Sequence, residues 1–159
     1  RHCVFAWSYR FSKHQIELIN GLEQGDPPLT VRGTRRLLMT ALMNLIDNSI
    51  NWLGTKKTKG RKLYVGTTQE LTGQPAFVVA DNGPGFKDPP SYLTMPFFTR
   101  KADGMGLGLH IADEVMKMHN GRVVFPEPGD ITLPKEFDGA VVMLQFGEES
   151  HEDSPRRRH

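Results

Sequence analysis

The sequence contains a single cysteine, Cys3, and no long hydrophobic run. One cysteine cannot form an internal disulfide or a zinc site built from several thiolates, which fits a reducing compartment such as the cytoplasm. The apolar stretches are far shorter than the roughly 18–20 residues that cross a bilayer, and no signal peptide opens the chain. We therefore expect a cytoplasmic domain that makes no membrane contact itself. Because the sequence begins at Arg1 rather than methionine, we expect any anchor or sensor to belong to a longer protein.

The chain has almost no excess charge of either sign, because 20 lysines and arginines face 18 acidic residues and leave a formal net charge of +2. Arg156, Arg157 and Arg158 follow an acidic run near the end of the chain and have no aromatic neighbours. Such a terminal cluster is typical of a solvated tail rather than of a nucleic-acid surface. No nucleic-acid partner is expected.

A length of 159 residues, 38% of them hydrophobic, suits one domain with one core. We expect residues 1–13 to be the end of an upstream helical linker, residues 14–147 to form the domain, and residues 148–159 to be a disordered tail. Periodicity and turn residues predict helices over 1–13, 34–53 and 106–119, and strands over 14–20, 29–32, 62–70, 76–80, 121–125 and 140–146.

The order of these elements predicts the fold class. Strands and helices are mixed without a repeated βαβ unit, which favours an α+β fold. We expect a two-layer α/β sandwich, with a mixed sheet packed against about three helices. Residues 87–104 are proline-containing and lack periodicity, and a loop of this length often acts as a lid.

Three asparagines share one side of the longest predicted helix. Asn44, Asn48 and Asn51 stand at i, i+4 and i+7, within about 60° of one another and beside the apolar face. Asparagine is a poor helix former, and an amide is costly to bury without a partner. The stripe therefore indicates either a ligand such as a metal ion or phosphate, or hydrogen bonds to neighbouring loops.

Two glycine-rich runs follow along the chain. Residues 81–86, Asp-Asn-Gly-Pro-Gly-Phe, come directly after an apolar strand and form either a pocket edge that a ligand can approach closely or a plain turn. Residues 104–109, Gly-Met-Gly-Leu-Gly-Leu, open a helix whose N–H groups and positive dipole end could receive phosphate oxygens. Neither run matches the P-loop pattern or the dinucleotide pattern, the two commonest nucleotide motifs.

Taken in order, these elements resemble a known superfamily. Residues 44–49, Asn-Leu-Ile-Asp-Asn-Ser, are similar to the N box of the histidine kinase and gyrase ATPases, and residues 81–86 to the first glycine box. Residues 96–101, Pro-Phe-Phe-Thr-Arg-Lys, are similar to the F box, and residues 104–109 to the second glycine box. The match runs from about residue 16 to residue 146. The chain thus resembles the ATP-binding catalytic domain of sensor histidine kinases, which shares the Bergerat fold with gyrase B, heat-shock chaperones and mismatch-repair ATPases.

The resemblance implies ATP and Mg²⁺ as cofactors. Asn48 is the implied Mg²⁺ ligand, since a neutral amide oxygen suits a hard cation that keeps several waters. Asp81 would accept the adenine amino proton, while Asn44 and Lys101 would take part in catalysis, with Lys101 as a mobile charge at the γ-phosphate. The implied nucleotide-binding set is Asn48, Asn51, Asp81, Gly83, Gly85, Phe86, Phe98, Thr99, Gly104, Met105, Gly106, Leu107, Gly108 and Leu109. Phe97 and Phe98 resemble the hydrophobic anchors of the lid, or alternatively are simply core residues.

Asn44 occupies the position where the hydrolysing relatives carry a glutamate that activates water. An amide cannot take a proton, whereas a neutral imidazole nucleophile needs less deprotonation than water does. The residue therefore favours phosphotransfer over rapid hydrolysis. Where many members next carry a lysine or arginine, this chain has Asn51 followed by Trp52, which leaves open whether the lysines of residues 56–59 contact the α-phosphate.

The implied function is that of a two-component sensor histidine kinase. MgATP would bind here, and the γ-phosphoryl would pass to a histidine on a dimerisation and phosphotransfer segment outside this chain, and then to a response regulator receiver. None of the six histidines has the helical histidine-acid-proline context of an acceptor, so autophosphorylation by this chain alone is not expected. Two alternatives share the same boxes: an ATP-gated conformational switch and an anti-sigma-type serine kinase.

The substitution Asp81→Asn tests the implied adenine contact. An amide cannot replace the carboxylate as the acceptor aimed at the adenine amino group without bringing its own N–H groups to the same place. We expect binding of labelled ATP to be lost or severely weakened, while the circular dichroism spectrum stays that of the unaltered protein. Unchanged ATP affinity would contradict the assignment of Asp81.

Overall fold

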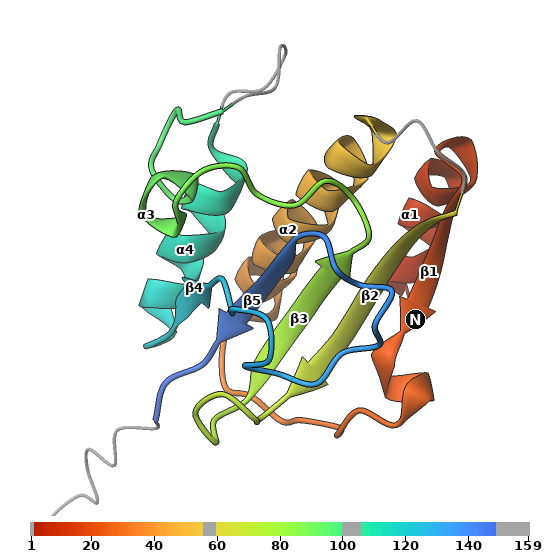
Figure 1. Cartoon of the computed structure of the whole chain (residues 1–159). Coiled ribbons are helices and arrows are strands. Elements are labelled where there is room, and N and C mark those ends of the chain that lie inside the picture. The colour runs from red at the N-terminus through yellow and green to blue at the C-terminus, as the bar shows by residue number, and fades with distance from the viewer. Residues whose placement is uncertain (1, 56–59, 100–105, 149–159) are drawn as a thin grey trace, which may run out of the picture.

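The computed structural model describes residues 2–55, 60–99 and 106–148, with side chains from residue 8 onward. All three predicted helices and five of the six predicted strands are present. Among the described elements, no helix is long and apolar enough to cross a membrane. In chain order the elements are α1 (His2–Lys13), β1 (Ile16–Asn20), the 3-10 turn η1 (Gly21–Gln24), α2 (Arg35–Thr55), β2 (Arg61–Thr68), β3 (Ala76–Asp81), α3 (Pro90–Leu93), α4 (Gly108–Met118), β4 (Arg122–Val124) and β5 (Val141–Gln145) (Figure 1).

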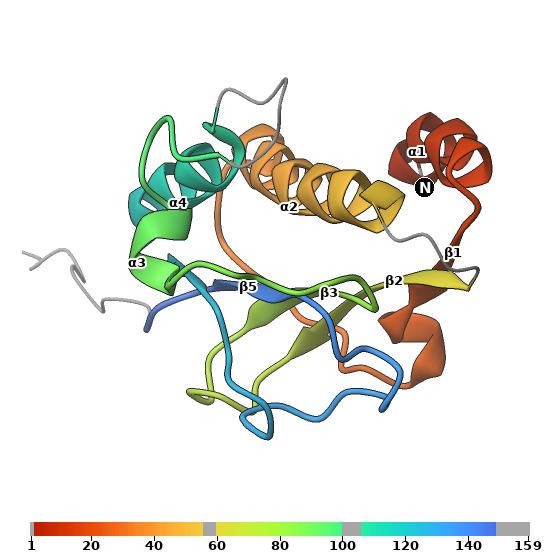
Figure 2. The ribbon, with the colours of Figure 1, turned by 45° about the horizontal axis from the view of Figure 1, so that its top comes forward.

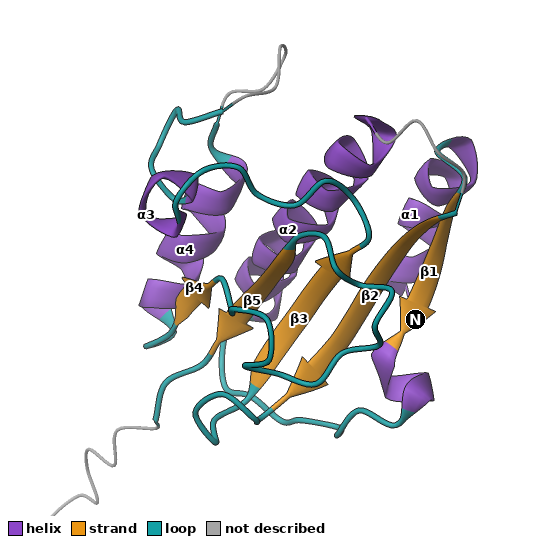
Figure 3. Cartoon of the chain, viewed as in Figure 1, coloured by secondary structure: helices purple, strands orange, loops and turns teal. Residues whose placement is uncertain are grey.

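The strands form one sheet in the order β1-β2-β3-β5-β4. β1 runs parallel to β2, and the other neighbours are antiparallel. β2 and β3 form the predicted hairpin, with Leu63 opposite Asp81 at its open end. The longer helices, which lie behind the strands in Figure 3, form a layer separate from the sheet in the turned view of Figure 2. The prediction of an α+β sandwich with a mixed sheet is therefore confirmed.

The main core lies between the sheet and the three longer helices. α1, α2 and α4 cover one face of the sheet, with α2 in the middle (Figure 2). Leu45, Ile50 and Leu53 of α2 are at most 1% exposed and belong to the same cluster as Met116 of α4 and Leu144 of β5. Burial of this apolar face fixes the rotation of α2 about its own axis, and so fixes where its polar side points.

The opposite face of the sheet is covered by the connection between β4 and β5, which crosses it as a long irregular segment (Figures 1 and 2). Phe137 is 4% exposed, and its ring centroid lies 5.3 Å from that of Tyr64 on β2. Ile131 and Leu133 pack against a second small cluster that contains Val78. Nothing in the residue pattern predicts this cover.

The end of α4 contacts the start of α2 through His119. The Nε2 atom of His119 accepts a hydrogen bond from the Thr34 N–H at 3.0 Å, and Nδ1 donates to the Val115 carbonyl at 2.7 Å. The first N–H groups of a helix have no partner within the helix, so this bond satisfies one of the donors at the start of α2. A Cβ on Gly33 would lie only 2.5 Å from the imidazole, which shows how closely the segments meet.

The prediction of a strand over 29–32 is wrong, because this stretch connects η1 to α2 without pairing with any strand of the described sheet. Pro27 and Pro28 have no N–H to donate to a ladder. Asp26 holds the segment in place instead, since its Oδ2 atom accepts the Tyr64 hydroxyl at 2.5 Å. A short run with β propensity forms a strand only where a sheet edge is available to it.

The irregular loop predicted over 87–104 contains one helical turn in its described part. α3 begins at Pro90, a residue that suits the first turn of a helix because its missing N–H needs no partner there. From Thr94 to Thr99 the backbone has no regular structure.

Truncation of Leu45 tests the contribution of α2 to the core. We expect Leu45→Ala to lower the free energy of unfolding by about 2–5 kcal/mol, because the side chain is 1% exposed and its removal leaves a cavity. Met43, on the same helix and 37% exposed, provides the matched control, and Met43→Ala should cost less than about 1 kcal/mol. Urea denaturation followed by circular dichroism measures both, and equal losses would contradict this account.

Candidate functional site

The asparagine stripe runs along the side of α2 that the core leaves uncovered. Asn44 and Asn48 are half-buried, and within the described part of the chain neither side chain makes a hydrogen bond. Asn51 is exposed and donates from Nδ2 to Asp47 Oδ2 at 3.4 Å. Among the described residues, hydrogen bonding to neighbouring loops therefore does not account for Asn44 and Asn48.

The start of α4 lies beside this stripe. A Cβ on Gly108 would come within 3.8 Å of the Asn44 Oδ1 atom. The residue before the helix, Leu107, has no polar side chain to cap the first N–H groups. The positive end of the helix, which has no side-chain cap among the described residues, thus faces the region next to Asn44, an arrangement suited to phosphate. The side chain of Leu109 faces the other way and is part of the main core.

The described part of the second glycine box also touches the F box. Gly106 has φ +70, and a Cβ there would lie 2.5 Å from the carbonyl carbon of Phe97 and 2.7 Å from that of Phe98. Phe98 is half-buried and stacks on Tyr92 with ring centroids 5.9 Å apart. Phe97 is 73% exposed and has a left-handed backbone with φ +63. Of the two phenylalanines, Phe98 packs against Tyr92, whereas the Phe97 side chain is exposed. The alternative prediction that both are core residues is therefore wrong for Phe97.

Asp81, the last residue of β3, is 1% exposed. Its Oδ1 atom accepts from the backbone N–H groups of Gly83 at 2.9 Å and Ala140 at 3.1 Å. Its own carbonyl accepts from the Gly139 N–H at 2.9 Å. Backbone groups from two separate segments therefore hold the carboxylate at the strand end, where the chain turns toward the first glycine box.

Gly139 and Ala140 were not predicted as site residues. A Cβ on Gly139 would lie 2.5 Å from Asp81 Oδ1 and 2.6 Å from the Gly83 nitrogen, so the close approach needs glycine. In the sequence, Gly139 precedes the last strand as an ordinary turn glycine would. No local signal distinguishes it, because its importance arises only when β5 pairs with β3.

The rest of the first glycine box is tied to its surroundings. Asn82 accepts the Lys62 N–H at 2.8 Å and donates to the Gly60 carbonyl at 2.7 Å, which fastens the turn to the start of β2. Gly85 adopts φ +77, a conformation that favours glycine. Phe86 packs edge-on against Phe125 with centroids 5.2 Å apart, so its side chain supports the turn from the core.

Several expected site residues lie outside the described residues. They include the predicted catalytic Lys101, the first two residues of the second glycine box, the lysines of the loop after α2 and most of the tail. Thr99 is half-buried at the edge of the described range. The predicted site and tail residues that lie outside the described ranges are Lys56, Lys57, Lys59, Arg100, Lys101, Gly104, Met105 and residues 149–159.

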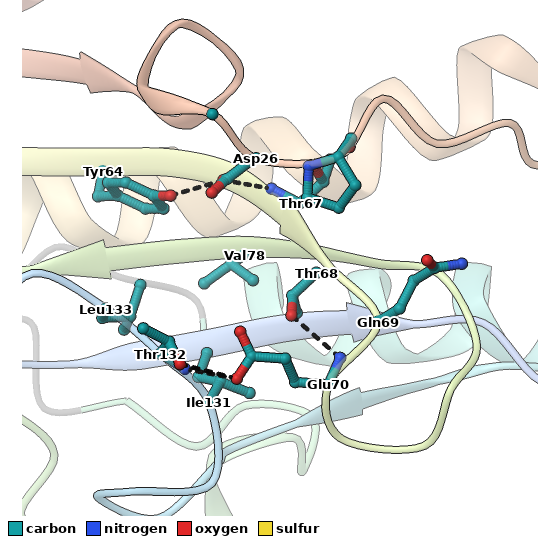
Figure 4. A pocket seen from close by; sticks show the side chains of 12 residues that line it. Asp26, Tyr64, Thr67, Thr68, Gln69, Glu70, Val78, Ile131, Thr132 and Leu133 are labelled. Atoms are coloured by element: carbon teal, nitrogen blue, oxygen red, sulfur yellow. Dashed lines mark hydrogen bonds between the residues drawn. The ribbon is translucent and has the colours of Figure 1, made fainter.

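A cavity of about 490 Å³ lies on the far face of the sheet, away from the helices (Figure 4). Its polar walls are tied together: Asp26 accepts from Tyr64, and Glu70 accepts the Thr132 N–H at 2.9 Å. Burial, and the hydrogen bond to Asp26, raise the pKa of the Tyr64 hydroxyl well above its usual value, so it remains a donor. None of the predicted nucleotide residues lines this cavity, which is separate from the candidate site.

The chain matches a known family. The model of the family described as "Histidine kinase-, DNA gyrase B-, and HSP90-like ATPase" matches residues 33–149. The C4-dicarboxylate transport sensor protein DctB of Pseudomonas aeruginosa is 38% identical over 111 residues, which cover 68% of this chain and 18% of that protein. The sensory histidine kinase/phosphatase NtrB of Rhizobium meliloti is 35% identical over 116 residues, 64% of this chain and 30% of that protein. The chain thus spans less than a third of either relative.

Solved structures share the architecture. The mycobacterial sensor histidine kinase MprB superposes with a TM-score of 0.63 at 26% identity, over 87% of this chain and 88% of that one. The nucleotide-free catalytic domain of the histidine kinase ThkA superposes with a TM-score of 0.64 over 90% of this chain and 87% of that one. At 20% identity, this likeness is evidence for the fold alone.

The substitution Gly139→Ala tests the backbone clamp on Asp81. The added Cβ would fall 2.5 Å from the carboxylate and must displace it. We expect ATP affinity to fall by about tenfold or more, or about 1.4 kcal/mol and above. Gly54→Ala is the matched control, since the nearest atom to a Cβ there is 4.0 Å away, and it should leave the affinity unchanged. Equal affinities of the two variants for labelled ATP would contradict the clamp.

Proposed function

The chain belongs to the family of histidine kinase-, DNA gyrase B- and HSP90-like ATPases, and we propose that it binds MgATP and transfers the γ-phosphoryl group to a histidine carried by another segment of the same protein. It is the catalytic ATPase domain of a two-component sensor histidine kinase. When bound, ATP supplies the phosphoryl group that the acceptor nitrogen attacks, and ADP leaves.

One observation carries this proposal. Asn44 and Asn48 present half-buried amides that have no hydrogen-bond partner within the described residues, and Asn44 lies directly beside the start of α4. Amide oxygens and uncapped helix N–H groups are suited to a hydrated Mg²⁺ ion and to phosphate oxygens, respectively. No three His, Cys, Asp or Glu side chains gather to hold a metal in the described part of the chain. We assign Asn48 as the residue that would hold a Mg²⁺ ion, which would supply positive charge to offset the phosphates.

We assign recognition of the base to Asp81 and the glycine-rich turn that follows it. The buried carboxylate is held by backbone donors on Oδ1, so its orientation costs little to maintain when a nucleotide arrives. The glycines at 83 and 85 allow the backbone to pass close to a flat ring. A carboxylate accepts a hydrogen bond from the adenine amino group, whereas guanine presents a carbonyl at the equivalent position and would be repelled.

The nature of Asn44 favours transfer over hydrolysis. An amide has no basic site for a water proton, so water bound near the γ-phosphate would not be activated by this residue. The acceptor histidine is a better nucleophile in its neutral form and needs no strong base. We propose that the role of Asn44 is to position phosphate or metal-bound water, and that Lys101 provides a charge near the γ-phosphate.

The partners follow from the chemistry. The acceptor would lie on a dimerisation and phosphotransfer segment of the same protein, and a response regulator receiver would accept the phosphoryl group in turn. We place the domain in the cytoplasm, where ATP is available and where a chain with one cysteine needs no disulfide. We retain 14–147 as the domain and 1–13 as the end of a helical linker.

A phosphotransfer assay tests the proposal. The chain is mixed with the acceptor-bearing segment of the same protein, MgATP and a γ-³²P label, and the Asp81→Asn variant serves as the inactive control. We expect acid-labile, base-stable label on the segment, together with negligible ATP hydrolysis by the chain alone. Acid-stable label would indicate a serine kinase, and nucleotide binding without transfer would indicate a switch. Robust hydrolysis that depends on Asn44 would overturn the kinase assignment.

A further inference from the structure

An acidic side chain borders the asparagine stripe of α2. Asp47 stands between Asn44 and Asn48 in the sequence, and on a helix it projects within about 40° of Asn51. Its side chain is 43% exposed, and its Oδ2 atom accepts from Asn51 Nδ2 at 3.4 Å. An unpaired carboxylate at this place would repel the phosphates of a nucleotide bound along the stripe.

A cation from a different element neutralises this carboxylate. Arg10 of α1 forms an ion pair with Asp47, its Nη1 atom contacting Oδ1, and its side chain is 35% exposed. α1 lies next to α2 on the same face of the sheet (Figure 2). The neighbouring residue Phe11 is 8% exposed in the main core, which holds α1 in the position that presents Arg10 to Asp47.

The two oxygens of Asp47 thus have separate partners. Oδ1 meets the guanidinium of Arg10, and Oδ2 meets the amide of Asn51. Arginine keeps its charge at all physiological pH values, so the neutralisation is permanent while α1 stays in place. The orientation of Asn51 therefore depends on a carboxylate that is itself held by α1.

We infer that Arg10 is a positioning residue for the nucleotide: it cancels the charge of Asp47 and steadies the Asn51 amide, and so makes ATP affinity depend on α1. The inference rests on the proposed function, because it concerns phosphates bound along the asparagine stripe. Arg10 acts through Asp47 and has no contact with the reacting atoms in this account.

A purely structural ion pair would behave differently. Exposed pairs contribute little to stability, so loss of Arg10 should leave folding nearly unchanged. A carboxylate at about 8 Å from doubly negative MgATP, with the dielectric of water, weakens binding on the order of fivefold. The same charge has no such effect on uncharged adenosine, and added salt screens it over a Debye length of about 8 Å at physiological ionic strength.

The experiment compares Kd values for MgATP and for adenosine in the 159-residue chain. The variants are Arg10→Gln, Arg10→Lys, Asp47→Asn and the double variant Arg10→Gln/Asp47→Asn. Lys13→Gln is the matched control, because it removes one positive charge from the end of the same helix, at an exposed residue without an ion pair to Asp47. Circular dichroism and thermal unfolding verify that each variant is folded.

We expect Arg10→Gln to weaken MgATP binding by about three- to tenfold at low salt, less at 0.5 M salt, with adenosine binding unchanged. Arg10→Lys should retain most of the affinity. Asp47→Asn should bind MgATP at least as tightly as the unaltered chain, and the double variant should return to within about twofold of it. Lys13→Gln should bind MgATP like the unaltered chain.

Four results would overturn the inference. Arg10→Gln could lose affinity equally for MgATP and adenosine, could lose no affinity, or could lose MgATP affinity that adding Asp47→Asn does not restore. The fourth result is weaker MgATP binding by Asp47→Asn alone. If Arg10→Gln does not fold, Asp47→Asn still tests the inference: with Arg10 left unpaired, MgATP binding at low salt should tighten while adenosine binding stays unchanged, and unchanged or weaker MgATP binding would contradict the inference. Failure of the unaltered chain to bind MgATP would instead contradict the proposed function, and the inference with it.

Discussion

Burial of the apolar face of α2 against the sheet is the constraint on which the site depends. Leu45, Ile50 and Leu53 are removed from water almost completely, and each would be costly to expose. With that face committed, the helix cannot rotate, and the asparagine stripe is held on its flank beside the start of α4. The position of the asparagines is thus defined by the packing of the apolar face of α2, to which the asparagines themselves contribute little.

Asp81 is the second residue on which the site depends. It joins the end of β3 to the segment before β5, which covers the opposite face of the sheet. The carboxylate receives hydrogen bonds from its own turn and from the start of β5. The segment that delivers Gly139 and Ala140 to it is anchored on the far face by Phe137 packed on Tyr64. A buried carboxylate is tolerated there because its donors are backbone N–H groups that the strand pairing brings into place.

Most of the regular elements could be predicted from local pattern. Periodicity was sufficient for α2 and α4, whose apolar faces are wide, and the order of elements was sufficient for an α+β sandwich. The strand predicted over 29–32 failed, since local propensity cannot say whether a sheet edge is within reach. The paired phenylalanines of the F box could not be separated by sequence, although Phe98 packs and Phe97 is 73% exposed.

By itself the sequence determined the asparagine stripe, the two glycine boxes and the absence of a base at Asn44, because helix geometry and residue chemistry are local properties. Only the tertiary structure decided that Gly139 and Ala140 clamp Asp81, that His119 contacts the start of α2 and that Arg10 meets Asp47. Each of these contacts joins residues at least 37 positions apart. No local pattern encodes them, since they exist only after burial of the apolar surfaces has brought the elements together.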